Sequence, residues 1–148
     1  MPDIYHDVPI GGTVEDVFKG VSASEGLSKW WSKAGSGEAG PEKEMSFDFG
    51  PGYHWKAVVE EFVPKKKIVF RMTKSDDDWN GTRIKFDIEE MGSGSLLRFE
   101  HLGWPDDNSH YRTSSYCWAM YLRCLKMYIE DGTELDYSRR FEGFRNQD

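Results

Sequence analysis

The sequence predicts an α+β domain in which a curved antiparallel sheet of about six strands wraps around a long C-terminal helix. Between residues 45 and 101, short segments of alternating apolar and polar residues are separated by turn residues. One long helical pattern follows at about residues 108–131, with its apolar positions on one face. A sheet with one apolar face must bury it, and this helix is the candidate cover.

The chain begins with one predicted strand and two short helices. Residues 4–10 alternate with a period of two, which is typical of a strand. Thr13 can cap a first helix, and Ser24 can cap a second helix over residues 24–32. The glycine-rich segment 35–40 is predicted to be a loop. The two short helices should therefore lie beside one end of the sheet.

Four to five further strands are predicted in the middle of the chain. Turn residues separate them, such as Pro51-Gly52 and Asn80-Gly81. Tight turns between consecutive strands indicate an antiparallel meander. Its apolar face is expected to carry Met45, Phe47, Trp55, Ala57, Val59, Ile68, Phe70, Met72, Ile84, Phe86, Ile88, Leu97, Phe99 and His101.

The last predicted element is the long helix, and the domain is expected to end with it. Its apolar face contains Trp118, Leu122 and Leu125, and Gly132 is suited to the position just after its C-terminus. We therefore expect one domain over residues 1–132 and a tail over residues 133–148. This layout is a helix-grip arrangement, and it leaves a gap beneath the helix.

Charge and cysteine content limit the possible partners. The formal net charge is -7, so nucleic acid and membrane surfaces are poor partners. Residues 1–10 contain no secretory signal pattern. Cys117 and Cys124 lie seven residues apart on the predicted helix, about 10 Å, which is too far for a disulfide. Two unpaired thiols predict a cytoplasmic location.

No motif predicts a metal site, a cofactor or a catalytic nucleophile. The chain lacks the spacings of zinc sites, and it has no nucleophile elbow and no phosphate loop. His101 shares the inward parity of Leu97 and Phe99. It could anchor a ligand or act as an acid or base, or it could be a hydrogen-bonded histidine at a strand end.

Aromatic residues make up 15% of the chain and must fill a core or surround a cavity. Four strands carry large rings on their inward faces, and further rings fall in the loops and helix starts at the expected cavity mouth. Plain core packing is the alternative for any one of them. As a set they suit an aromatic or ring-shaped ligand. The candidate ligand-binding residues are Trp31, Phe47, Trp55, Phe70, Trp79, Phe86, Phe99, His101, Trp104, Tyr116 and Trp118.

Four segments together resemble a known family. They are VEDVFKGVSASEGLSKWW (14–31), VVEEFVPKKKIVFRM (58–72), GTRIKFDIEEMGSGSLLRFEHLGW (81–104) and CWAMYLRCLKMYIEDG (117–132). The sequence resembles the SRPBCC superfamily, which has the START-like, birch-pollen-allergen-like fold. Within it, the chain is most similar to the family named after the activator of the heat-shock ATPase.

The resemblance implies a cavity between helix and sheet that holds a small hydrophobic ligand. It implies no particular reaction, since relatives include carriers, co-chaperone domains and cyclases. The leading hypothesis is a ligand-binding module without catalytic activity. The alternatives are a polyketide-like cyclase or hydrolase that uses His101, and a protein-interaction module that assists a chaperone. A homodimer or a chaperone is the expected protein partner.

Overall fold

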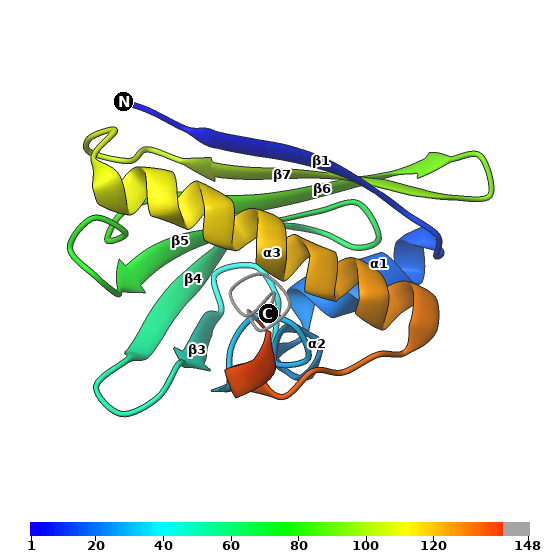
Figure 1. The fold of residues 1–148 in the computed structure, drawn as a ribbon, viewed down its shortest axis with the longest axis horizontal. Coiled ribbons are helices and arrows are strands. Elements are labelled where there is room, and N and C mark those ends of the chain that lie inside the picture. The colour runs from blue at the N-terminus through cyan, green and yellow to red at the C-terminus, as the bar shows by residue number, and fades with distance from the viewer. Residues whose placement is uncertain (141–148) are drawn as a thin grey trace, which may run out of the picture.

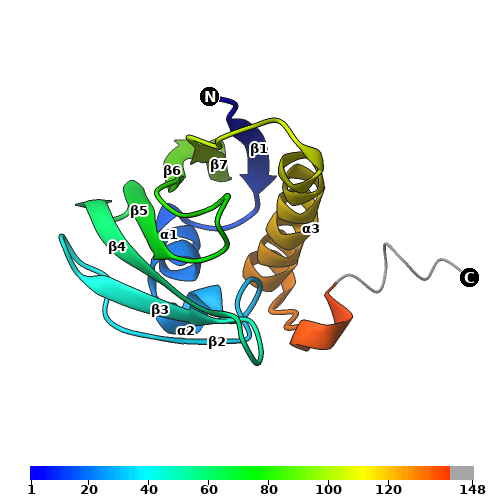
Figure 2. The same ribbon diagram turned by 90° about the vertical axis from the view of Figure 1, so that its left-hand side faces the viewer.

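One seven-stranded antiparallel sheet curves around the C-terminal helix α3 in the computed structural model of the chain, which describes residues 1–140 (Figures 1 and 2). The strand order is β1-β7-β6-β5-β4-β3-β2. The strands are β1 (Ile4–Ile10), β2 (Ala34–Ser36), β3 (Glu44–Asp48), β4 (His54–Val63), β5 (Lys67–Lys74), β6 (Arg83–Met91) and β7 (Gly94–Leu102). The helices are α1 (Val14–Ser22), α2 (Ser24–Leu27), α3 (Ser109–Asp131) and the short 3-10 helix η1 (Tyr137–Arg139).

The predicted fold class is confirmed, because the alternating residues face α3 as expected. Along β5, β6 and β7 the inward positions are buried, and the long helix covers that side of the sheet. In cross-strand register, Phe86 on β6 lies opposite Phe99 on β7. Neighbouring strands therefore place their large rings side by side under the helix.

The predicted boundaries of α3 are also confirmed. The Asn108 side chain accepts a hydrogen bond of 2.9 Å from the backbone N–H of Tyr111 and so caps the N-terminus. Gly132 has a φ of 70°, the left-handed conformation in which glycine is favoured, and it ends the helix.

The segment predicted as a loop at residues 35–40 contains part of an additional strand. β2 is a three-residue edge strand, and it pairs with β3 so that Gly35 lies opposite Phe47. A Cβ atom at Gly35 would lie 2.9 Å from the carbonyl oxygen of Ser46, so this pairing requires glycine. Glycine is usual in loops, and for that reason the sequence pattern did not indicate a strand.

The second helix is shorter than predicted. α2 ends at Leu27, and the chain continues in turns through residue 32. Both Trp31 N–H and Ser32 N–H donate to the Leu27 carbonyl, and the indole N–H of Trp30 donates to the carbonyl of Gly20 in α1 over 2.8 Å. Burial of the two tryptophans therefore determines the path here, in preference to further helical turns.

Two register shifts in β4 curve the sheet. They lie between Lys56 and Ala57 and between Val59 and Glu61 in the pairing with β5. Bulges of this kind increase local twist and bend a strand. The shifts therefore help to curve the part of the sheet that β4 joins to β3 and β2.

The predicted domain boundary at residue 132 stays a prediction, but the chain does not leave the domain there. After Gly132 it turns back and forms η1 beside α2 and α3 (Figure 2), and Arg140 is buried. Residues 141–148 of the predicted tail lie outside the described residues. Within residues 1–140, no helix is long and apolar enough to cross a membrane.

Candidate ligand site

The space between α3 and the concave face of the sheet is filled by a cluster of aromatic rings centred on Trp118. The Trp118 ring stacks at 5.3 Å on Trp31 and at 5.8 Å on Trp79, measured between centroids. Phe99 from β7 approaches the same ring to 4.4 Å. Trp118 therefore connects α3 to the turn after α2, to the β5–β6 loop and to the sheet.

A void of about 30 Å³ remains within this cluster. Its wall is formed by Trp31, Trp79, Ser114, Cys117, Trp118 and Tyr121. A single water needs roughly 10–15 Å³, so the void as it stands is too small for a ring. Side chains of the protein occupy the space in which a ligand was expected.

His101 is the buried polar centre next to the rings. Its Nδ1 accepts a hydrogen bond of 3.1 Å from the indole N–H of Trp118, which can only donate. In the neutral ring Nε2 then carries the proton and donates it over 2.8 Å to Thr82 Oγ1. The Thr82 hydroxyl donates in turn over 2.6 Å to the Trp79 carbonyl. Both nitrogens of His101 are therefore used inside the protein.

Burial keeps His101 uncharged. The ring is fully buried, and this desolvation, with a smaller effect from His110, lowers the pKa of His101 to about 3. A neutral histidine with two internal partners positions Trp118 and the Trp79 backbone. In this arrangement it is poorly placed to give or take a proton from a ligand.

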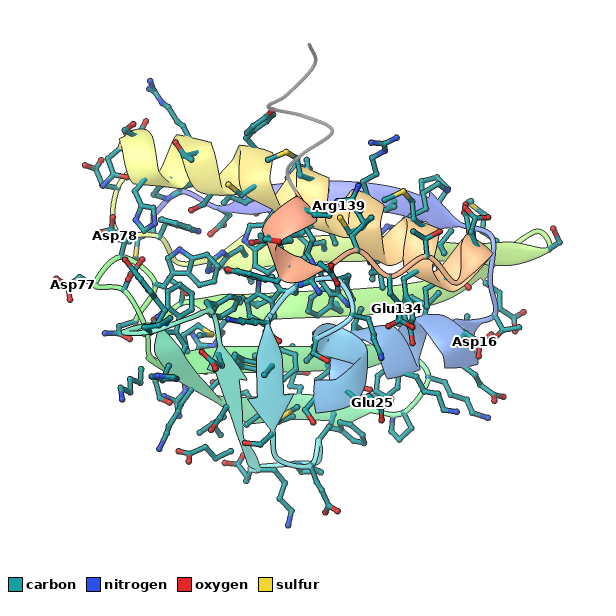
Figure 3. All side chains as sticks on the ribbon, turned by 60° about the horizontal axis from the view of Figure 1, so that its bottom comes forward. Asp16, Glu25, Asp77, Asp78, Glu134 and Arg139 are labelled. Atoms are coloured by element: carbon teal, nitrogen blue, oxygen red, sulfur yellow. The ribbon has the colours of Figure 1, made fainter. Side chains whose placement is uncertain are left out.

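The β5–β6 loop that carries Trp79 is tied to the start of α3 by Asp78 (Figure 3). Asp78 Oδ2 lies 3.0 Å from Nδ1 of His110 and accepts from Asn108 Nδ2 over 3.3 Å. The hydrogen bond with His110 lowers the pKa of the Asp78 carboxyl below its usual range. This connection fixes one end of the void wall against the helix.

Two indole N–H groups in the cluster, those of Trp79 and Trp104, are buried without a hydrogen-bond partner among the described residues. Buried donors are nearly always paired, so each such group needs an explanation. Trp79 lines the void. The Trp104 ring packs against the Trp79 ring, with their centroids 6.0 Å apart. The Trp79 N–H is not exposed at the surface of the void, so an acceptor atom of a bound molecule could reach it only after the rings part.

Sequence comparison identifies the family of this fold. Residues 12–130 match the family described as Activator of Hsp90 ATPase homolog 1-like protein. The chain belongs to this family. The activator-like family is a member of the SRPBCC superfamily, which agrees with the resemblance seen in the sequence. No curated protein matches the chain at significant similarity.

Solved structures similar to this activator-like chain include that of the Aha1 dimer from Colwellia psychrerythraea. It is 25% identical with a TM-score of 0.81, over 90% of this chain and 99% of that one. The protein SSP2350 from Staphylococcus saprophyticus is 20% identical with a TM-score of 0.76, over 90% and 96% of the two chains. DynU16, from the dynemicin biosynthetic locus, is 16% identical with a TM-score of 0.77, over 90% of this chain and 50% of that one. The last two show the fold alone.

The structure of this activator-like chain brings most of the predicted site residues together. Phe47, Phe70, Phe86 and Phe99 form a row of buried rings across the sheet. Trp55 is half-buried and contacts Trp79 at 4.9 Å between centroids. Trp31, Trp79, His101, Trp104 and Trp118 form the end of the cluster that contains the void.

Tyr116 is the predicted residue that the structure places elsewhere. It is 55% exposed, and it precedes Trp118 by two residues, or about 200° around the helix, so it lies on the opposite face. The prediction missed Ser114, Cys117 and Tyr121 as lining residues. Ser114, Cys117 and Tyr121 follow one another at spacings of three and four residues, and Ser114 and Tyr121 lie four and three residues from Trp118. This is the spacing of one helical stripe, and that signal could have found them.

The larger hollows of the described residues lie at the surface. One of about 460 Å³ separates α1 and α2 from the end of α3, where Asp16 and Glu25 line it (Figure 3). Another of about 530 Å³ is lined by residues 75–78 and His110. Within residues 1–140, no group of three or more His, Cys, Asp or Glu side chains is arranged to hold a metal ion.

Proposed function

We propose that this activator-like protein binds a small aromatic or hydrophobic ligand that carries a hydrogen-bond acceptor, at the void between Trp31, Trp79, Trp118 and Tyr121. The observation that supports the proposal most is the aromatic void whose wall contains Trp79, a residue with a buried indole N–H that has no hydrogen-bond partner among the described residues. Ring faces offer stacking area for a flat ligand, and the N–H offers orientation.

Binding requires the void to widen, because about 30 Å³ does not hold a ring. A ligand that buries about 300 Å² of apolar surface gains roughly 7 kcal/mol. The entropy lost on association and the parting of stacked rings offset part of that gain. We therefore expect a dissociation constant between about 10 µM and 1 mM for a simple ring compound.

The test is a titration with 2-naphthol, followed by the indole N–H signals in a ¹⁵N–¹H correlation spectrum. The six tryptophans give six such signals, which single Trp→Phe variants can assign. We expect the Trp79 signal to move with saturation, because its donor gains a partner. Trp30 serves as the internal control, since its N–H already bonds to the Gly20 carbonyl at 2.8 Å. Unchanged Trp79 and Trp118 signals at millimolar 2-naphthol would contradict the proposal.

The cyclase or hydrolase alternative depends on His101 as an acid or base. The geometry favours binding over this chemistry, because Trp118 and Thr82 occupy both ring nitrogens. The similarity to DynU16 is at the level of the fold and supports no reaction.

A second candidate function is protein interaction with an Hsp90-type chaperone. Membership of the activator-like family and 25% identity to the Colwellia Aha1 favour it. The measurement is the ATP hydrolysis rate of the host Hsp90 with and without this protein. A concentration-dependent increase is expected if the chain acts as an activator. An unchanged rate, together with no complex in sedimentation velocity, would remove this candidate; the same sedimentation experiment tests for a homodimer.

A further inference from the structure

Arg140 is buried in a cradle of backbone carbonyl groups. It is 5% exposed, and its guanidinium donates to the carbonyls of Ser28 at 2.7 Å and of Trp31 and Ser32 at 2.9 Å. Its Nε donates to the Leu135 carbonyl at 3.2 Å. A buried charge is costly unless its donors are satisfied. Four backbone carbonyls accept hydrogen bonds from the Arg140 guanidinium. Among residues 1–140, Arg140 makes no hydrogen bond to a carboxylate.

Arg140 ends a segment that joins the turn after α2 to the helix α3. We name residues 133–140 the strap. At its start, Glu134 (Figure 3) pairs with Lys29 at 3.0 Å. At its end, the Arg140 carbonyl lies 3.9 Å from Sγ of Cys124 on α3. In between, Tyr137 is hydrogen-bonded to Tyr121. Burial raises the pKa of Tyr121, and the charge of Tyr137 and this hydrogen bond raise it further.

The strap contacts both sides of the proposed ligand site. Trp31 and Tyr121 line the void. Arg140 donates a hydrogen bond to the Trp31 carbonyl, and Tyr137 is hydrogen-bonded to Tyr121. η1, within the strap, lies next to the C-terminal end of α3 (Figure 2). At the other edge, the Tyr111 hydroxyl of α3 donates at 2.6 Å to the carbonyl of Asp3, the residue just before β1. The strap is therefore the segment that connects Trp31 and Tyr121, two residues of the void wall.

We propose that the strap is a latch that holds Trp31 and Tyr121, on two sides of the void, in place while Arg140 sits in its carbonyl cradle, and that releases them when Arg140 leaves it. Release would free the backbone of Trp31 and uncover the Tyr121 side of α3, so that the rings could separate. The biological meaning of opening rests on the proposed ligand binding, but closure itself can be tested without any ligand.

The test is the alkylation of the two thiols by iodoacetamide in the full chain, mapped by mass spectrometry of tryptic peptides. Cys124 touches the strap, and Cys117 lines the void. Cleavage at Arg123 places them in different peptides. The variant is Arg140→Ala, and Ser138→Ala is the control, since Ser138 is an exposed residue of the same strap.

Loss of several hydrogen bonds to a charged group should raise the labelling rate of both thiols in Arg140→Ala by at least about tenfold. Ser138→Ala should label at the wild-type rate. Equal rates for wild type and Arg140→Ala overturn the proposal, and so does faster labelling of Cys124 with Cys117 unchanged, because the strap would then cover the helix without closing the void.

Circular dichroism checks that Arg140→Ala is folded. If it is not, Tyr137→Ala removes a strap contact while Arg140 remains, and the same increase at Cys117 is expected of it. Failure of ligand binding would be seen separately, as indole signals that 2-naphthol does not move. Failure of the latch would be seen as equal labelling rates.

Discussion

The two edges of the sheet hold α3 in different ways. At the β1 edge, backbone carbonyls receive hydrogen bonds from the helix: the Tyr111 hydroxyl donates to Asp3, and Lys126 donates to Pro9. His6 Nε2 lies 3.2 Å from the Ser115 carbonyl. At the β2 edge, the contacts with α3 come from aromatic rings and from the strap.

The difference separates a fixed side from a side that can open. Hydrogen bonds to a strand backbone hold the helix in one register. Ring contacts and a segment held by Arg140 tolerate rearrangement, because their partners are side chains and a short stretch of chain. Two residues of the void wall, Trp31 and Tyr121, are contacted by the strap, whereas the loop that carries Trp79 is tied to the start of α3 by Asp78.

The largest expected effect is at Trp118, which contacts both sides. Trp118→Ala should reduce the free energy of unfolding by about 3–5 kcal/mol, as loss of a buried large ring does elsewhere. Trp118→Phe keeps most of the packing but leaves Nδ1 of His101 without its donor, which costs about 1–3 kcal/mol. Urea denaturation measures both. Equal losses in the two variants would show that the hydrogen bond, and not the ring, connects the two sides.

The next effect is a dependence on pH that His101 introduces beside the ring cluster. Its folded pKa of about 3 lies below the unfolded value of about 6.5, so only the unfolded state takes up the proton between those values. The contribution of neutral His101 to the free energy of unfolding is therefore fully present above pH 6.5 and is lost as the pH falls towards 3. Between pH 7 and pH 5 the loss is about 2 kcal/mol.

The measurement is urea denaturation of wild type and His101→Gln at pH 5 and pH 7. Glutamine keeps one acceptor and one donor, so the variant should fold but lose most of this pH dependence. His54→Gln changes an exposed histidine and should keep the wild-type dependence. If His101→Gln retains the full slope, His101 is not the group responsible.

The sequence was a good guide to the fold because period-two alternation and helix caps are local signals. Strand parity correctly placed Phe86, Phe99 and His101 on the inward face. Gly132 correctly marked the end of α3. Parity does not say whether the enclosed space is filled, because this depends on side-chain orientations across several elements. The cluster around Trp118, with its void of about 30 Å³, could be seen only in the structure.

Arg140 and β2 were missed for the same reason. An arginine in a mixed, aperiodic segment is usually solvated, and nothing near Arg140 in the sequence indicates carbonyls from residues 28–32 as its partners. Gly35 permits a close strand pairing, yet it carries no strand pattern. Both features depend on contacts between segments that are distant or weakly patterned.

A smaller effect is expected at Tyr111, which ties β1 to the helix. Tyr111→Phe removes the hydroxyl that donates to the Asp3 carbonyl and should cost about 1 kcal/mol. Faster amide exchange at the start of β1 should accompany it. Tyr5→Phe is the matched control, because the exposed Tyr5 hydroxyl bonds to the side chain of the same Asp3, and no measurable change is expected. Slower exchange, or an effect confined to Tyr5→Phe, would show that the β1 edge is not held in this way.

The smallest effect is expected at Tyr116, on the face of α3 away from both edges. Because it is 55% exposed, Tyr116→Ala should change the free energy of unfolding by less than about 0.5 kcal/mol. It should also leave the 2-naphthol titration unchanged. Tyr121→Ala, one helical turn away on the void wall, should instead weaken that titration. If Tyr116→Ala weakens binding and Tyr121→Ala does not, the ligand lies on the outer face of α3. The void between Tyr121 and Trp31 would then not be the ligand site.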